Sequence, residues 1–85
     1  MKLAFALVAL STLALAPAAN AADARLTDCV QMAKQVSAAL EAAQPSTSTD
    51  QARQQASAGR SYCGSQMYTA GVAHYSKALQ LLGKN

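Results

Sequence analysis

Residues 29–63, CVQMAKQVSAALEAAQPSTSTDQARQQASAGRSYC, begin and end with a cysteine and have a polar connector at their centre. The connector, PSTST at 45–49, contains the midpoint between Cys29 and Cys63. In an antiparallel helical hairpin joined at this connector, residues equidistant from the turn lie at the same height. The connector and the cysteine pair therefore predict the same hairpin, with Cys29 and Cys63 joined by a disulfide, the usual state of an even cysteine count in a small exported protein.

Helical spacing appears on both sides of the connector. Apolar and small residues recur every three or four positions over 23–43, which is typical of one helix face. Asp23 can cap the start of this helix, and Pro45 ends it because the residue before a proline avoids helical angles. A second helix is expected from Ser48, which fits a capping box with Gln51. The predicted faces are Leu26, Cys29, Val30, Ala33, Val36, Ser37 and Leu40, then Ala52, Ala56, Gly59 and Cys63.

The most apolar stripe of residues 22–85 lies near the C-terminus. If the hairpin is symmetric, residues 70–82 extend beyond the first helix, and such a stripe does not stay bare in water. Either the chain breaks at Gly64-Ser65, where Gly64 ends the second helix and Ser65 starts a third that folds back, or one long second helix dimerises. Capping preferences favour the break. The sequence thus predicts an all-α fold: a disulfide-stapled antiparallel hairpin with a third C-terminal helix. The predicted interaction surface consists of Tyr68, Val72, Tyr75, Leu79 and Leu82.

The N-terminus has the layout of an export signal. A short positive start, Met1-Lys2, precedes an apolar run over 3–15, and Ala19 and Ala21 are the small residues before a cleavage site. The run is too short for a membrane-spanning helix. We therefore expect a signal peptide at 1–21, a single small domain at 22–85 that has no membrane segment, and a periplasmic or secreted location.

Composition argues against several function classes. Residues 22–85 carry six basic and four acidic residues, spread without a run, whereas nucleic-acid binding needs a concentrated basic face. No Asp or Glu follows Asp50, so His74 has no carboxylate within helical reach to orient it as a catalytic base. We expect no catalytic residues, no cofactor and no enzymatic activity.

A soft metal site is the alternative reading of the single histidine. Imidazole and thioether ligands suit copper, so His74 could join Met67 or Met32. Methionines also fill gaps in hydrophobic cores, and that structural role is the more common one. One histidine and two methionines do not form a dense cluster of metal ligands, so we expect these side chains to have structural roles.

Residues 58–83 resemble a single tetratricopeptide (TPR) motif. The matching small and aromatic positions are Gly59, Tyr62, Tyr68, Gly71, Tyr75 and Ala78. The departures are Gln55, where the family has a large aromatic residue, Ala58 in place of leucine, and Gly83 in place of proline. TPR arrays need at least about three repeats, so the resemblance implies a helix–turn–helix packing mode and only weakly implies peptide recognition.

Taken together, the residues predict a small exported, non-enzymatic interaction or accessory module that uses its apolar C-terminal helix. Its partner would be another protein or a second copy of the chain. The alternative is a periplasmic protein that binds a small ligand or a copper-type metal.

Overall fold

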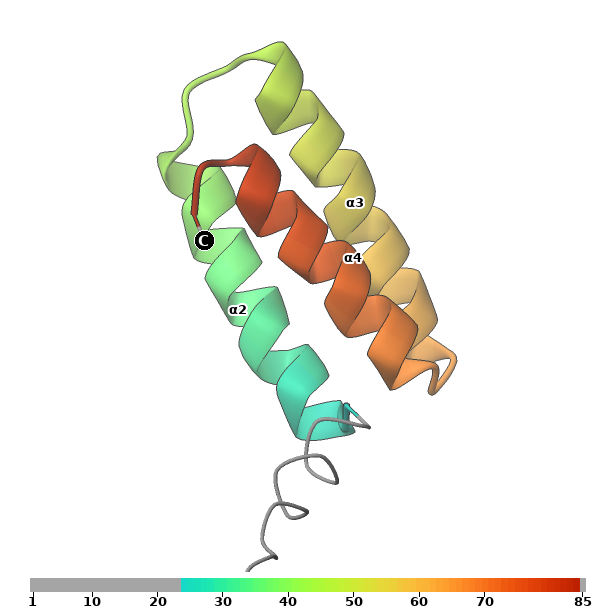
Figure 1. Cartoon of the computed structure of the whole chain (residues 1–85). Helices are drawn as coiled ribbons and strands as arrows, with labels where there is room; N and C mark the ends of the chain where they lie inside the picture. The colour runs from blue at the N-terminus through green and yellow to red at the C-terminus, as the bar shows by residue number, and fades with distance from the viewer. Residues whose placement is uncertain (1–23, 85) are drawn as a thin grey trace, which may run out of the picture.

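The computed structural model describes residues 24–84, which form three α-helices (Figure 1). These are α2 at Leu26–Ala42, α3 at Thr47–Gly64 and α4 at Tyr68–Leu81. The predicted all-α fold, with a disulfide between the first two helices and a third C-terminal helix, is confirmed. One long second helix is wrong, because the chain turns after Gly64. The predicted signal peptide at 1–21, its cleavage site and the Asp23 cap lie outside the described residues.

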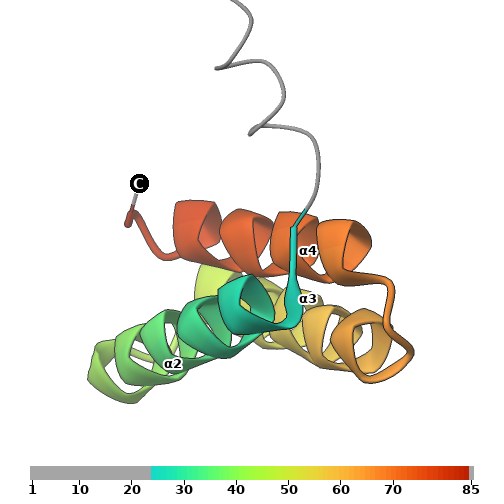
Figure 2. The same ribbon diagram turned by 90° about the horizontal axis from the view of Figure 1, so that it is seen from below.

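The three helices form a bundle in which α3 runs antiparallel to both α2 and α4 (Figure 1). Helix α4 packs most extensively on α3 and also contacts α2. Seen from below, α4 lies over one side of the α2–α3 pair (Figure 2). Within residues 24–84, no helix covers the opposite side of that pair. None of the three helices is long and apolar enough to span a bilayer.

The start of α3 differs from the sequence prediction. Ser46, not Ser48, is the N-cap, and its Oγ accepts a hydrogen bond of 3.0 Å from the backbone N–H of Thr49. The buried Thr49 hydroxyl donates to the carbonyl oxygen of Gln44 at 2.7 Å. Starting at Ser46 satisfies the connector carbonyl as well as the helix end, which a start at Ser48 does not do. In α2, the Asp28 carboxylate accepts the Arg25 N–H at 2.8 Å, a local cap that the prediction missed.

The turn between α3 and α4 is a Schellman motif. The N–H of Met67 donates to the Tyr62 carbonyl at 2.9 Å, and the N–H of Gln66 donates to the Cys63 carbonyl at 3.1 Å. Ser65 is the C-cap of α3, so the prediction that it starts the next helix is wrong. Helix α4 starts at Tyr68 because the motif uses the preceding residues to satisfy the last carbonyls of α3.

The same motif ends α4, but with a different residue at the left-handed position. There Gly83 has φ of 75°, whereas in the α3–α4 turn Gln66 has φ of 67°. A side chain disfavours this conformation because its Cβ crowds the backbone, and glycine lacks that atom. The α3–α4 turn therefore holds Gln66 in an unfavourable conformation.

Gln66→Gly should raise the free energy of unfolding by about 0.5–1 kcal/mol, because it removes that crowding. Urea unfolding followed by circular dichroism measures the change. The inverse control, Gly83→Gln, should destabilise the domain. Equal stability of the wild type and Gln66→Gly would contradict the strain at this turn.

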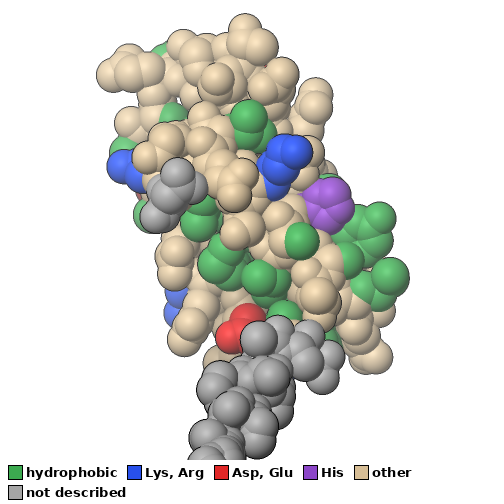
Figure 3. Space-filling model, viewed as in Figure 1, with side chains coloured by type: hydrophobic (Ala, Val, Ile, Leu, Met, Phe, Trp, Pro, Cys, Tyr) green, Lys and Arg blue, Asp and Glu red, His purple; other side chains and the backbone are tan. Residues whose placement is uncertain are grey.

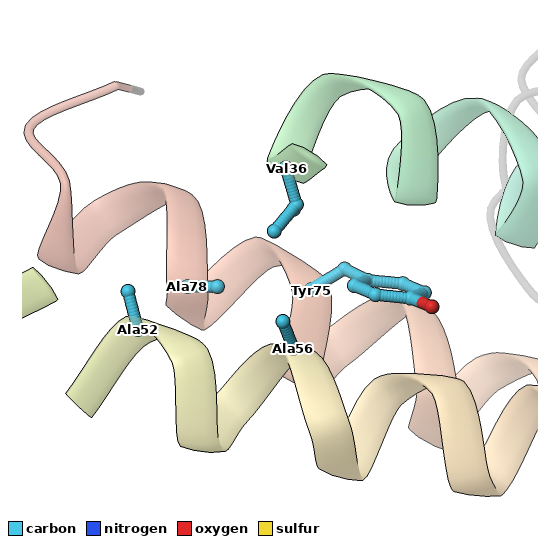
Figure 4. Close-up of a cluster of buried hydrophobic side chains, with 5 residues drawn as sticks. All are labelled: Val36, Ala52, Ala56, Tyr75 and Ala78. Atoms are coloured by element: carbon cyan, nitrogen blue, oxygen red, sulfur yellow. The ribbon is translucent and has the colours of Figure 1, made fainter. Parts of the chain in front are cut away.

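The core is small and rich in alanine. Its buried members come from all three helices, and the Tyr75 ring of α4 points between α2 and α3 (Figure 4). Small side chains let the helices approach closely: a Cβ placed on Gly59 would lie 2.9 Å from the Tyr75 ring. A core of this size supplies only a few kcal/mol of net stability. Its members are Val36, Ala52, Ala56, Tyr75 and Ala78.

The predicted inner face of α2 is only partly buried. Cys29 and Val36 are buried, and Ala33 and Leu40 pack beside the core. Leu26, Val30 and Ser37, which belong to the same predicted helix face, are exposed. The apolar residues of α2 therefore cover a wider part of the helix surface than α3 and α4 contact.

All three helices meet at the disulfide. It joins Cys29 of α2 to Cys63 of α3, and the Cys29 Sγ lies 3.8 Å from the Tyr68 carbonyl oxygen at the start of α4. Gly71 of α4 packs directly on the bridge. A Cβ at Gly71 would overlap the Cys63 Sγ and lie 3.1 Å from the Gly59 carbonyl oxygen. Because the disulfide occupies the space next to α4, only glycine fits at position 71.

Gly71→Ala should lower the free energy of unfolding by about 2 kcal/mol, because the obstructing atoms are a fixed sulfur and backbone rather than a flexible side chain. Gly64→Ala is a matched control, since nothing lies within 4 Å of the Cβ position there. This control should be neutral or slightly stabilising because alanine favours helices. Thermal unfolding of both variants measures the difference, and a stable Gly71→Ala protein would contradict this packing.

Candidate functional site

The predicted C-terminal stripe lies mainly against the bundle. Tyr75 is 5% exposed and belongs to the core, so it is not part of a free surface. Leu79 and Leu82 are half-buried and pack against that core, and Tyr68 and Val72 are also half-buried. The stripe therefore stabilises the fold first, and only the outer edges of its side chains are available to a partner.

One open groove runs between α2 and the C-terminal end of α4. Leu79 of the predicted stripe forms one wall, and small side chains of α2 form the other. The groove has a volume of about 550 Å³. Because alanines line it, the backbone of a bound segment could approach α2 closely. This α2–α4 groove is lined by Gln35, Ala38, Ala39, Ala42, Leu79 and Lys84.

A second hollow lies at the start of α4. Its volume is about 610 Å³, and its most exposed apolar side chain is Met67, at 53%. In the space-filling view, hydrophobic side chains gather near this end of the bundle beside the histidine (Figure 3). Tyr68 and Ala70 also line the hollow. It is a shallow apolar surface without an acidic residue among its lining side chains.

His74 makes two side-chain contacts across α3 and α4. Its Nδ1 lies 2.7 Å from the Gln55 Oε1, so the histidine can donate this hydrogen bond. Its ring stacks on Tyr62, with centroids 5.1 Å apart and planes inclined by 6°. Gln55, where the TPR family has a large aromatic residue, is half-buried and orients the imidazole. A helical spacing cannot reveal such a pair, because the partners lie on different helices.

The candidate metal ligands lie in different settings. Met67 is the exposed residue before α4, whereas Met32 of α2 packs against the core. One ring nitrogen of His74 already faces an amide oxygen. Within residues 24–84, no group of three or more His, Cys, Asp or Glu side chains could hold a metal ion. The arrangement therefore gives no specific support to a copper site.

A third groove separates α2 from α3. Exposed Leu26 and Val30 line one end, Leu40 lines the other, and Arg60 lies in both halves. The three-and-four spacing predicts a shared helix face for the apolar residues of α2, and the even spread of basic residues does not single out Arg60, so this surface was not predicted. Only the spacing between the helices reveals that these residues border a groove.

In the helix–turn–helix formed by α3 and α4, Gly59 of the TPR-like pattern packs against the Tyr75 ring, and Gly71 packs near the Gly59 carbonyl oxygen. No protein-family model matches the chain, and no curated protein or solved structure does.

Proposed function

We propose that this protein is a small exported, non-enzymatic interaction module that binds another protein through the α2–α4 groove beside its C-terminal helix. The observation that carries the proposal is an open apolar groove of about 550 Å³ in which Leu79 faces a wall of alanines. Protein-binding sites typically place an apolar centre inside a polar rim. Gln35 and Lys84 supply polar groups at the edge of this groove.

The proposed location is the periplasm or the exterior. A disulfide that joins the helices of so small a domain is typical of an oxidising compartment. The export signal expected at 1–21 is consistent with that location. N-terminal sequencing of exported protein should start at or next to Ala22, and a retained Met1 would contradict export by this route.

The resemblance of residues 58–83 to one TPR motif supports the class of function rather than a particular ligand. Members of that family bind peptides on a surface built from several repeats, and one hairpin offers a much smaller surface. We therefore propose a short apolar segment of a partner protein as the ligand of the α2–α4 groove.

Ala38→Lys tests this proposal because it fills the groove without altering the core. Ala38 is exposed on α2 and lines the groove. The matched control is Ser76→Lys, an exposed position on α4 that does not line this groove. A periplasmic partner held by the wild type and by the control should be lost with Ala38→Lys. Equal retention by all three proteins would refute binding in this groove.

A further inference from the structure

The groove between α2 and α3 is lined by residues of both helices. Helix α4 lies over one side of this pair and leaves the other side uncovered (Figure 2). Tyr75 reaches the groove from α4, because its ring projects between the two helices (Figure 4). The groove has two adjoining halves of about 280 and 240 Å³. Both halves share three residues, Ala33, Arg60 and Tyr75, which mark its centre. We call this surface the α2–α3 groove.

The ends of the α2–α3 groove are apolar. Leu26 and Val30 line one end and are 56% and 45% exposed. Leu40 and Val36 line the other end. Exposed apolar side chains that border a groove supply apolar area that a protein partner can bury. A ligand that contacts both ends would cover Leu26, Val30 and Leu40.

Arg60 gives the centre of the α2–α3 groove a positive charge. Arg60 is exposed there, and no acidic residue lines either half. The Tyr75 ring borders the same central region but is almost fully buried. An arginine guanidinium pairs well with a carboxylate because it offers two parallel N–H donors. The groove therefore complements a ligand with one carboxylate between two apolar ends.

The length of the groove fits a helix. From Leu26 to Leu40 it follows about four turns of α2, or roughly 20 Å at 1.5 Å per residue. A partner helix of similar length would lie along α2 and α3 opposite α4 and complete a four-helix arrangement. Such helix-in-groove binding uses apolar side chains that recur every three or four residues.

A second copy of this chain does not fit that description. The described acidic residues are Asp28, Glu41 and Asp50, and each lies within a turn of a helix end. The Asp28 carboxylate is also engaged by the Arg25 N–H. None of them lies at the middle of an apolar helix face. We propose that the α2–α3 groove binds an amphipathic helix of a different protein, whose apolar face carries one Asp or Glu near its middle.

The proposal is independent of the α2–α4 groove and is tested with synthetic peptides. The probe is a capped helix-forming peptide of about 15 residues, with leucines on either side of a central Glu on one face. The comparison peptide has Gln in place of that Glu. Amide chemical shifts of the oxidised protein locate the binding site. The Glu peptide should shift Val30, Ala33 and Arg60 and bind about tenfold more tightly than the Gln peptide.

Arg60→Gln should remove the preference for the Glu peptide, while the control Arg53→Gln, an exposed arginine on the same helix outside both halves, should retain it. The preference should also weaken with added salt. The proposal would be overturned if the two peptides bind equally well, or if neither binds at millimolar concentration. Self-association of the protein in sedimentation that depends on Val30 would overturn it as well. Chemical-shift changes confined to Ala38 and Leu79 would also overturn this proposal, but they would support binding in the α2–α4 groove. If the α2–α4 groove proves not to bind a partner, this peptide test is unaffected.

Discussion

Replacing both Tyr75 and Leu79 with alanine should unfold the domain. Tyr75 is the largest side chain of the buried cluster, and Leu79 packs against that cluster from one turn farther along α4. Removing both side chains should lower the free energy of unfolding by roughly 4–8 kcal/mol, because a core of small residues cannot close around the space. That loss is comparable to the entire stability of a domain of this size.

Circular dichroism and sedimentation of the double variant measure this effect. The matched control replaces Lys77 and Gln80, exposed residues of the same helix, with alanine and should leave the fold intact. A double variant that stays helical but loses a partner would mean that the stripe acts mainly at an interface. A variant that keeps its stability, oligomeric state and partners would refute both roles, and the proposed role of α4 with them.

Removing the disulfide should have the next largest effect. The bridge closes a separation of 34 residues, and the chain-entropy account gives about 4 kcal/mol for a loop of that length. Reduction, or Cys29→Ala with Cys63→Ala, should therefore lower Tm by roughly 20 °C or more. The effect is large because α2 has few other means of holding its position: it buries only Cys29 and Val36.

Mass spectrometry provides the complementary measurement. Native protein from an oxidising compartment should have a mass two hydrogens below that of the reduced chain, and thiol reagents should not modify it. Full alkylation of both cysteines before reduction would contradict the bridge. If reduction leaves Tm unchanged, the core contributes more to stability than its small residues suggest.

The two predictions have different structural origins. Tyr75 stabilises the folded state by burial, whereas the disulfide acts largely by restricting the unfolded chain. Their effects should therefore be distinguishable. The core variant loses helical structure even with the bridge intact, while the reduced wild type keeps the same folded contacts at low temperature.

Local chemistry was sufficient for the helices and for the pairing of the cysteines. The three-and-four spacing identified each helical segment, Pro45 ended the first, and the symmetry of Cys29 and Cys63 about the connector gave the register of the hairpin. These features depend on neighbouring residues or on simple helix geometry. The break after Gly64 could be predicted for the same reason.

The tertiary structure decided which candidate caps and faces are used. Ser46 and Ser48 are both good N-caps, and Ser46 is selected where Thr49 is buried and bonded to Gln44. Gln66, rather than Gly64, takes the left-handed position of the α3–α4 turn, and with this turn Gly71 of α4 packs on the disulfide. Leu26 and Val30 have the spacing of core residues, but they line a groove because α4 covers only one side of α2 and α3. Periodicity shows which residues share a helix face, while exposure depends on how many neighbouring helices reach that face.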